Sequence, residues 1–205
     1  MALNKMVSAL NFLLFQHLFV ILNISYLHSL KIFYKTLEKM QKFIEEYNGD
    51  ATKEMFDSEF SKEIVTKFIE VMDEDFNTSA AVANLHNIFK YANAIMNEAK
   101  KSTRQVTANT LAKMVKDIRK VYSVLGLLEQ NPEKFIIELK EKYLKKLQIS
   151  PKDIESFISE RANAKKLKDY NRADSIRENL ENKGIILNDT RDGTEWDIKA
   201  LYKVF

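Results

Sequence analysis

Only four glycines and two prolines occur among the 205 residues of this chain. Both residue types end helices and shape tight turns, so their scarcity disfavours a turn-rich β architecture and predicts long, uninterrupted helices. Hydrophobic residues make up 45% and charged residues 30% of the sequence, which indicates a protein with a buried core. Cysteine is absent, which excludes disulfides, thiol nucleophiles and cysteine-ligated metals.

Apolar residues recur every three or four positions along the first two thirds of the chain, which is the spacing of one helix face. This pattern predicts one or two helices over 6–48 and further helices over 53–73, 79–101 and 107–129. Such a series forms an antiparallel helical bundle. Its inward-facing residues include Leu30, Phe33, Leu37, Met40, Phe56, Phe60, Ile64, Phe68, Leu85, Ile88, Phe89, Leu111, Met114 and Ile118.

The segment 6–30 is strongly apolar and has three possible interpretations. A membrane-spanning helix needs about 20 mostly apolar residues, and polar side chains interrupt this segment repeatedly. A secretory signal needs a basic start and a small-residue cleavage site; Lys5 is a weak start and no such site follows. We therefore favour a buried helix over a membrane segment or a cleaved signal, and we expect a cytoplasmic protein.

The last third of the chain has a different texture. A lysine-rich helix over 133–148 is expected to end before Pro151, which marks the predicted boundary between a bundle over 1–148 and a subdomain over 151–205. Two shorter helices are predicted within 151–182, ended by Gly184 in a left-handed conformation. A short strand at 185–187, a polar loop and a second strand at 194–196 then predict a small β-hairpin. The fold class is therefore mainly α.

The sequence contains no recognisable catalytic machinery. It lacks glycine-rich phosphate loops, nucleophile elbows and His-Glu-x-x-His motifs, and its three histidines are widely separated. We therefore predict no catalytic residues and no metal site. The stretch 100–146 carries twelve Lys or Arg against five Asp or Glu, a pattern that suits either a solvated helix face or a contact with phosphates.

Basic, aromatic and acidic residues are mixed in the stretch 161–177, and a polar loop further on ends at the single tryptophan, Trp196. Unpaired RNA bases are bound by stacking on aromatic rings and by hydrogen bonds to their edges. Carboxylates such as Asp174 and Asp189 can accept hydrogen bonds from base amino groups. From the residues alone, RNA binding and an ordinary solvated helical hairpin both remain open.

Three motifs resemble cysteine–tRNA ligases. The run 72–80, Met-Asp-Glu-Asp-Phe-Asn-Thr-Ser-Ala, is similar to that family's Asp-Asp-Asp-Phe-Asn-Thr-Pro-x-Ala signature. Residues 160–174 resemble its Arg-x-x-Ala-Arg-x-x-Lys-Asp-aromatic-x-x-Ala-Asp pattern, and 184–196 resemble its Gly-Ile-x-Leu-x-Asp-x-x-x-Gly-Thr-x-Trp ending. The motifs follow the family's order, and with a fainter match at 12–26 the resemblance covers about 12–200.

The resemblance implies the tRNA-binding C-terminal portion of such a ligase, with a helical bundle of the class I synthetase anticodon-binding type. Carried over by position, the residues that contact the anticodon of a cysteine tRNA are Lys165, Tyr170, Asp174 and Asp189, with Trp196 as a packing or stacking partner. The complete family enzyme uses ATP and zinc, but its His-Ile-Gly-His motif and zinc ligands are absent from this chain. We therefore expect no cofactor in this chain and no ligase activity from it alone.

Two alternatives remain open from the sequence. In the first, the chain is a helical interaction protein that docks a partner, such as a separate catalytic half, through its apolar N-terminal helix. In the second, residues 6–30 hold the chain on a membrane, which we consider the weaker alternative.

Overall fold

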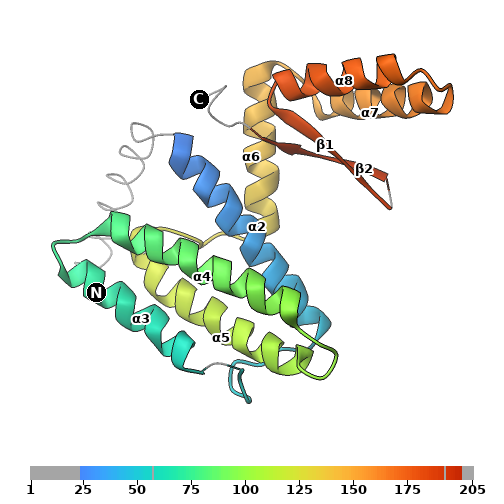
Figure 1. The fold of residues 1–205 in the computed structure, drawn as a ribbon. Helices are drawn as coiled ribbons and strands as arrows, with labels where there is room; N and C mark the ends of the chain where they lie inside the picture. The colour runs from blue at the N-terminus through green and yellow to red at the C-terminus, as the bar shows by residue number, and fades with distance from the viewer. Residues whose placement is uncertain (1–23, 57, 192, 200–205) are drawn as a thin grey trace. The chain divides into compact units, whose positions relative to one another are not determined.

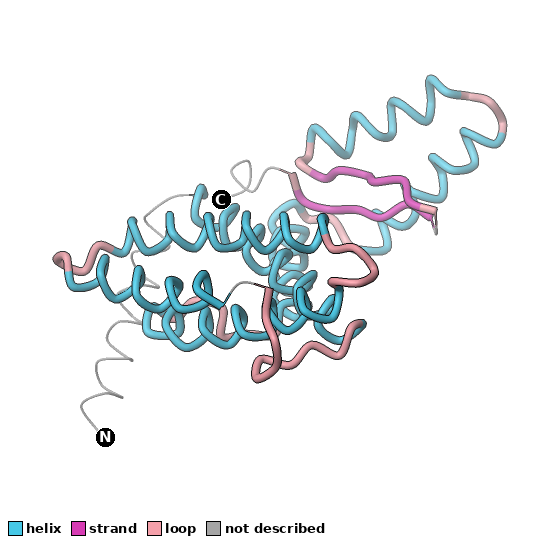
Figure 2. Tube along the Cα trace, turned by 60° about the horizontal axis from the view of Figure 1, so that its bottom comes forward, coloured by secondary structure: helices cyan, strands magenta, loops and turns pink. Residues whose placement is uncertain are grey.

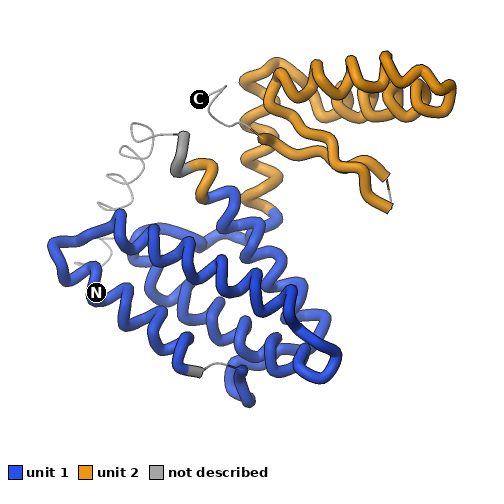
Figure 3. The backbone as a smooth tube through the Cα atoms, viewed as in Figure 1, with its two compact units in different colours: residues 1–22, 30–133 blue, residues 23–29, 134–205 orange. Residues whose placement is uncertain are grey.

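The computed structural model describes residues 24–56, 58–191 and 193–199 (Figure 1). The chain forms two compact units (Figure 3). Within the described residues, the first unit comprises 30–133 and the second comprises 24–29 and 134–199. One or two helices were predicted over 6–48, and the described part of that range forms α2, Ile24–Glu46. The apolar residues 6–23 lie outside the described part of the chain. No described helix has the length and apolar character needed to cross a bilayer.

The first unit is the predicted helical bundle, formed by most of α2 together with α3 (Ser58–Asp73), α4 (Thr78–Glu98), α5 (Arg104–Tyr122) and the short η1 (Ser123–Leu125). The mainly helical fold class is confirmed. The predicted apolar stripes supply its core, because Phe33, Leu37, Met40, Leu85, Leu111, Met114 and Ile118 are almost completely buried. Lys31 on α2 is buried as well.

Local chemistry fixes where these helices begin and end. Asn77 is the N-cap of α4, and its side chain accepts a hydrogen bond from the Ala80 N–H at 3.0 Å. The short η1 stops at Gly126, whose φ of 68° suits glycine. The buried Tyr122 hydroxyl donates to the Ala81 carbonyl at 2.9 Å, and burial raises the pKa of Tyr122. This bond ties α5 to the first turn of α4.

The helix predicted for 53–73 begins five residues late, at Ser58. Side chains of α5 hold the preceding segment in an extended loop: Asn109 donates to the Glu54 carbonyl at 2.8 Å, and Thr110 accepts from the Phe56 N–H at 2.8 Å. Phe56, expected in the core, is therefore 63% exposed. The prediction was wrong here because these hydrogen bonds join residues more than 50 positions apart.

Gly49 follows α2 where the loop meets α5 most closely. Asn48, and not Gly49, takes the left-handed conformation, with a φ of 48°. A Cβ at position 49 would lie 2.5 Å from the Ala108 carbonyl oxygen, closer than real Cβ contacts come. We expect Gly49→Ala to lower the free energy of unfolding by about 1–3 kcal/mol, because backbone must shift to relieve the overlap. Urea unfolding followed by circular dichroism measures this, with the exposed Glu45→Ala as the control that should stay near wild type.

The second unit contains α6 (Pro132–Leu147), α7 (Pro151–Lys166), α8 (Tyr170–Asn182) and a hairpin of β1 (Ile185–Thr190) and β2 (Gly193–Ile198). The strands in the described part of the chain are the two that pair in this hairpin (Figure 2). Its core joins residues of all these elements: Leu139, Tyr143, Leu144, Ile154, Ile176, Leu180, Ile185, Leu187 and Ile198. Because Leu139, Tyr143 and Leu144 belong to it, α6 groups with the C-terminal elements, and the units divide at 133–134 where the sequence suggested 148–151.

Common capping residues stand at the ends of the second unit's helices. Its hairpin is longer than predicted. Ser150 and Asp153 form a capping box at the start of α7, and Gly184 has a φ of 76° after α8. The strands continue through residues predicted to form a loop, with Asn188 opposite Glu195 and Asp189 opposite Thr194. Asn and Asp are typical turn residues. Asp189 is nevertheless kept in the strand by its side-chain hydrogen bonds to α7 and to Thr194.

Candidate nucleic-acid interface

Asp189 on β1 accepts four hydrogen bonds from within the chain. Arg161 on α7 binds both carboxylate oxygens at 2.9 and 3.0 Å, in the bidentate geometry of a guanidinium. Lys165 donates to Oδ2 at 3.0 Å and the Thr194 hydroxyl donates to Oδ1 at 2.8 Å. A carboxylate has about four lone-pair sites, so this network uses its whole accepting capacity. We call these four residues the Asp189 cluster.

The sequence assembles this cluster by simple spacing rules. Arg161 and Lys165 are four positions apart, so they lie on the same face of α7 and reach the same carboxylate. Thr194 stands directly opposite Asp189 in the antiparallel hairpin, where side chains of paired residues are neighbours. The cluster therefore fastens the hairpin to α7.

Charge complementarity within the cluster is strong. Hydrogen bonds from Arg161, and then from Lys165 and Thr194, hold the pKa of Asp189 well below its usual range. The Arg161 side chain is only 5% exposed, while that of Asp189 is 48% exposed. Asp189, and to a smaller extent Asp174, raise the pKa of the Arg161 guanidinium. Arg161 thus depends on Asp189 to neutralise its buried charge.

Lys165 in the cluster, and Tyr170 and Asp174 on α8, remain accessible. The Lys165 side chain is 44% exposed and uses one of its three donors on Asp189. Tyr170 is the first residue of α8 and is 62% exposed. Asp174, one turn further along α8, is exposed and close enough to Arg161 to act on its charge. The structure therefore offers a cation, an aromatic ring and a carboxylate to solvent around one pair of helices.

Trp196 on β2 has a packing role. Its ring is half-buried against the core of the second unit, and the Lys140 ammonium lies 4.4 Å from the ring centroid. The same ammonium donates to the Trp196 carbonyl at 2.9 Å. Of the two roles considered for Trp196 from the sequence, packing is the one that these contacts display.

Sequence reasoning missed the residues that organise the interface. Arg161 stands in the motif at 160–174 but received no role, although its four-residue spacing from Lys165 was a usable signal. Asp189 was predicted to contact RNA, and in the structure its carboxylate accepts four hydrogen bonds from Arg161, Lys165 and Thr194. Lys140 gave no signal, because its contact with Trp196 spans 56 positions.

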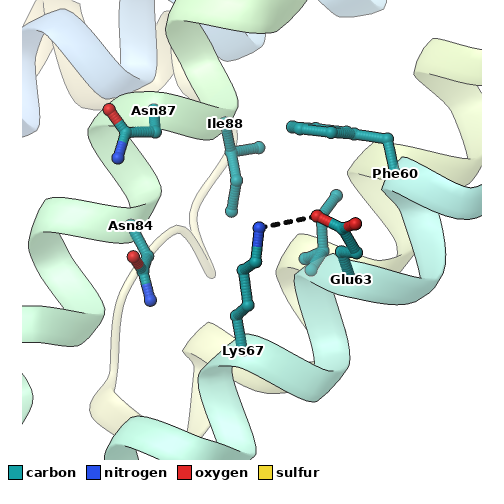
Figure 4. A pocket seen from close by; sticks show the side chains of 7 residues that line it. Phe60, Glu63, Lys67, Asn84, Asn87 and Ile88 are labelled. Carbon is teal, nitrogen blue, oxygen red and sulfur yellow. Dashed lines mark hydrogen bonds and ion pairs between the residues drawn. The ribbon is translucent and has the colours of Figure 1, made fainter.

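The first unit has a small cleft between α3 and α4. A cleft of about 60 Å³ is lined by Phe60, Glu63, Ile64, Lys67, Asn84, Asn87 and Ile88 (Figure 4). Lys67 donates to Glu63 within it at 2.6 Å, so the cation of the cleft is already paired with a carboxylate. The cleft is smaller than a typical ligand pocket. Among the described residues, no group of histidines and carboxylates could hold a metal ion.

Comparison with known proteins places this arrangement in a family. Residues 67–129, the second half of α3 with α4 and α5, match the DALR domain. The cysteine–tRNA ligase of Geotalea uraniireducens (strain Rf4) is 38% identical over 152 residues, 74% of this chain. This chain is related to the cysteine–tRNA ligases. Those of Marinobacter nauticus and Acinetobacter baumannii (strain SDF) are 41% and 34% identical over 130 and 168 residues, or 63% and 82% of this chain.

The matched region is one part of those ligases. It spans 30% of the Geotalea ligase, 26% of the Marinobacter ligase and 32% of the Acinetobacter ligase. The relationship corresponds to the C-terminal portion of cysteine–tRNA ligases, as the motifs predicted.

Proposed function

We propose that this chain binds tRNA and reads the anticodon of a cysteine tRNA with the exposed residues of α7 and α8. The observation that carries the proposal is the Asp189 cluster, which fixes Lys165 on α7, while Tyr170 and Asp174 are exposed on α8, the helix packed against α7. A rigid frame with accessible basic, aromatic and acidic groups suits the splayed bases of an RNA loop. The similarity to cysteine–tRNA ligases supports cysteine tRNA as the ligand.

Each exposed residue has a distinct part in this proposal. Tyr170 stacks on one base through its ring. Lys165 directs its remaining donors at a phosphate or at a base acceptor, while its bond to Asp189 restricts its position. Asp174 accepts a hydrogen bond from a base amino group. Asp189 and Arg161 act as positioning residues that hold α7 and the hairpin together.

The first unit contributes a sequence-independent attraction. Lys116 and Lys120 lie on one face of α5 and are at least partly exposed, whereas Lys113 on that helix pairs with the buried Asp117. Accessible lysines at a spacing of four can follow a phosphate backbone, whose neutralisation releases counterions. This part of the proposal makes tRNA binding weaken as salt increases.

The activity of a whole cysteine–tRNA ligase is a further proposal, because the chain spans about 30% of its relatives. We propose that a separate catalytic domain, using ATP and zinc, acts on the tRNA that this chain binds. In this proposal the catalytic domain, and not this chain, carries the cofactor sites. Aminoacylation assays with and without an added catalytic domain test it, and activity from this chain alone would contradict it.

Asp174→Ala tests the anticodon contact. We expect it to weaken binding to cysteine tRNA by about tenfold, the effect of losing one base-edge hydrogen bond to a charged acceptor. Fluorescence anisotropy with labelled tRNA measures this, and heparin serves as the unrelated polyanion. Glu155→Ala, at an exposed carboxylate near the start of α7, is the matched control. Equal losses for tRNA and heparin would contradict a base contact, and no tRNA binding by the wild type would contradict the function.

A further inference from the structure

Leu167 is the most exposed large apolar residue in the described chain, with 82% of its surface accessible. It is the C-cap of α7, at the turn that leads into α8. An exposed leucine taken alone is ordinary. This one stands three positions before the exposed Tyr170, so an aliphatic and an aromatic side chain are both exposed where α7 leads into α8.

The turn is tightly closed, so its backbone holds Leu167 outward. Leu167 N–H donates to the Asn163 carbonyl at 3.0 Å and Asp169 N–H donates to the Ala164 carbonyl at 2.9 Å. Lys168 has a φ of 61°, a conformation that a non-glycine residue adopts only when its surroundings fix it. The Asp169 side chain then caps α8 by accepting from the Arg172 N–H at 3.0 Å. The backbone that carries Leu167 is therefore fixed before it meets a partner.

Charge around the turn identifies the chemistry of that partner. Lys165, Lys166 and Lys168 are all exposed, and Asp169, the acid among them, is engaged in the cap. An anionic partner that also offers apolar, flat surfaces fits this combination. A nucleic acid loop has both properties, because its phosphates are charged and its unstacked bases have exposed faces.

We propose that Leu167 is a wedge that enters the tRNA anticodon loop beside Tyr170 and holds two neighbouring bases apart. Apolar side chains that separate stacked bases are a known means of deforming nucleic acids. Tyr170 then stacks on a base that Leu167 has separated from its neighbour. The inference rests on the proposed tRNA binding and assigns Leu167 a part in it that neither its charge nor its motif position indicates.

The test uses the full chain and an anticodon stem-loop of cysteine tRNA with 2-aminopurine in the loop, whose fluorescence rises on unstacking. Wild-type protein is expected to raise the fluorescence. Leu167→Ala is expected to weaken binding by about fivefold to twentyfold and to abolish most of the rise, because one separated base loses its partner. The slope of affinity against salt should not change, since leucine neutralises no phosphate.

Two further variants make the result decisive. Leu167→Lys adds a positive charge to a basic turn. If the turn bound RNA by charge alone, this variant would bind the stem-loop more tightly. If Leu167 is a wedge, the variant still loses the rise in fluorescence. Ile137→Ala removes another exposed aliphatic side chain from the same unit and should behave as wild type. Unchanged affinity and fluorescence in Leu167→Ala would overturn the wedge while leaving tRNA binding intact. Leucine-dependent binding to phosphatidylserine vesicles in place of RNA would overturn it as well, and a wild type that binds no RNA would overturn both proposals.

Discussion

Asp189→Ala is expected to lower the free energy of unfolding of the C-terminal unit by about 2–3 kcal/mol. Its loss leaves the Arg161 guanidinium, 5% exposed, without its counter-charge. Removing one partner of a fully buried ion pair costs about 3–5 kcal/mol, and the smaller value reflects the 48% exposure of Asp189. Urea unfolding followed by the fluorescence of Trp196, the single tryptophan, reports on this unit directly.

Glu160→Ala is the matched control, because Glu160 joins α7 to α8 through an exposed ion pair with Arg172. Exposed pairs contribute about 0–1 kcal/mol, so this variant should unfold close to wild type. Similar losses in both variants would contradict a special role for the Asp189 cluster.

The stability difference between wild type and Asp189→Ala also depends on pH. The pKa of Asp189 is lowered in the folded chain, so the carboxylate stabilises the fold above its unfolded pKa of about 3.9. This stabilisation declines as the pH falls below that value. We expect the difference between the two proteins to be constant from neutral pH to about pH 5 and to shrink at more acidic pH.

Tyr170→Ala is expected to weaken binding to cysteine tRNA by about tenfold to a hundredfold. Stacking of a base on an aromatic ring contributes about 1–3 kcal/mol, and alanine removes the ring. The ring is 62% exposed, so its removal should leave the unfolding transition unchanged. Anisotropy titrations and urea unfolding on the same preparations separate the two effects.

Two substitutions control this experiment. Tyr170→Phe keeps the flat ring and should retain most of the affinity. Phe56→Ala removes an equally exposed aromatic side chain, at 63%, from the first unit and should bind as wild type. Loss of affinity in Tyr170→Phe would show that the hydroxyl and not the ring makes the contact.

The buried face of each helix could be predicted because it depends on apolar residues that recur every three or four positions within that helix. Phe33, Leu37 and Met40 in α2 are buried as their spacing indicates. Phe56 was misplaced because Thr110, 54 positions away, binds its main chain, and no local pattern records that bond. Long-range hydrogen bonds between a loop and a distant helix lie beyond periodicity arguments.

The sequence could group the proposed site residues in one subdomain, but it could not predict the hydrogen bonds among them. The motifs identified Lys165, Tyr170, Asp174 and Asp189, and the structure places these residues along α7, α8 and β1 of one unit. Composition could not show that Asp189 binds Arg161 in bidentate fashion, since that pairing joins residues 28 positions apart. Asp189 and its neighbour Asn188, both typical loop residues, lie in β1.

Affinity for two tRNAs that differ by one anticodon base measures the central claim most directly. The full chain would be titrated with cysteine tRNA and with the same tRNA after a single substitution in the anticodon, at equal salt. The account predicts about tenfold tighter binding to the unaltered tRNA, with the preference lost in Asp174→Ala or Tyr170→Ala. Equal affinities for both tRNAs in the wild type would contradict it.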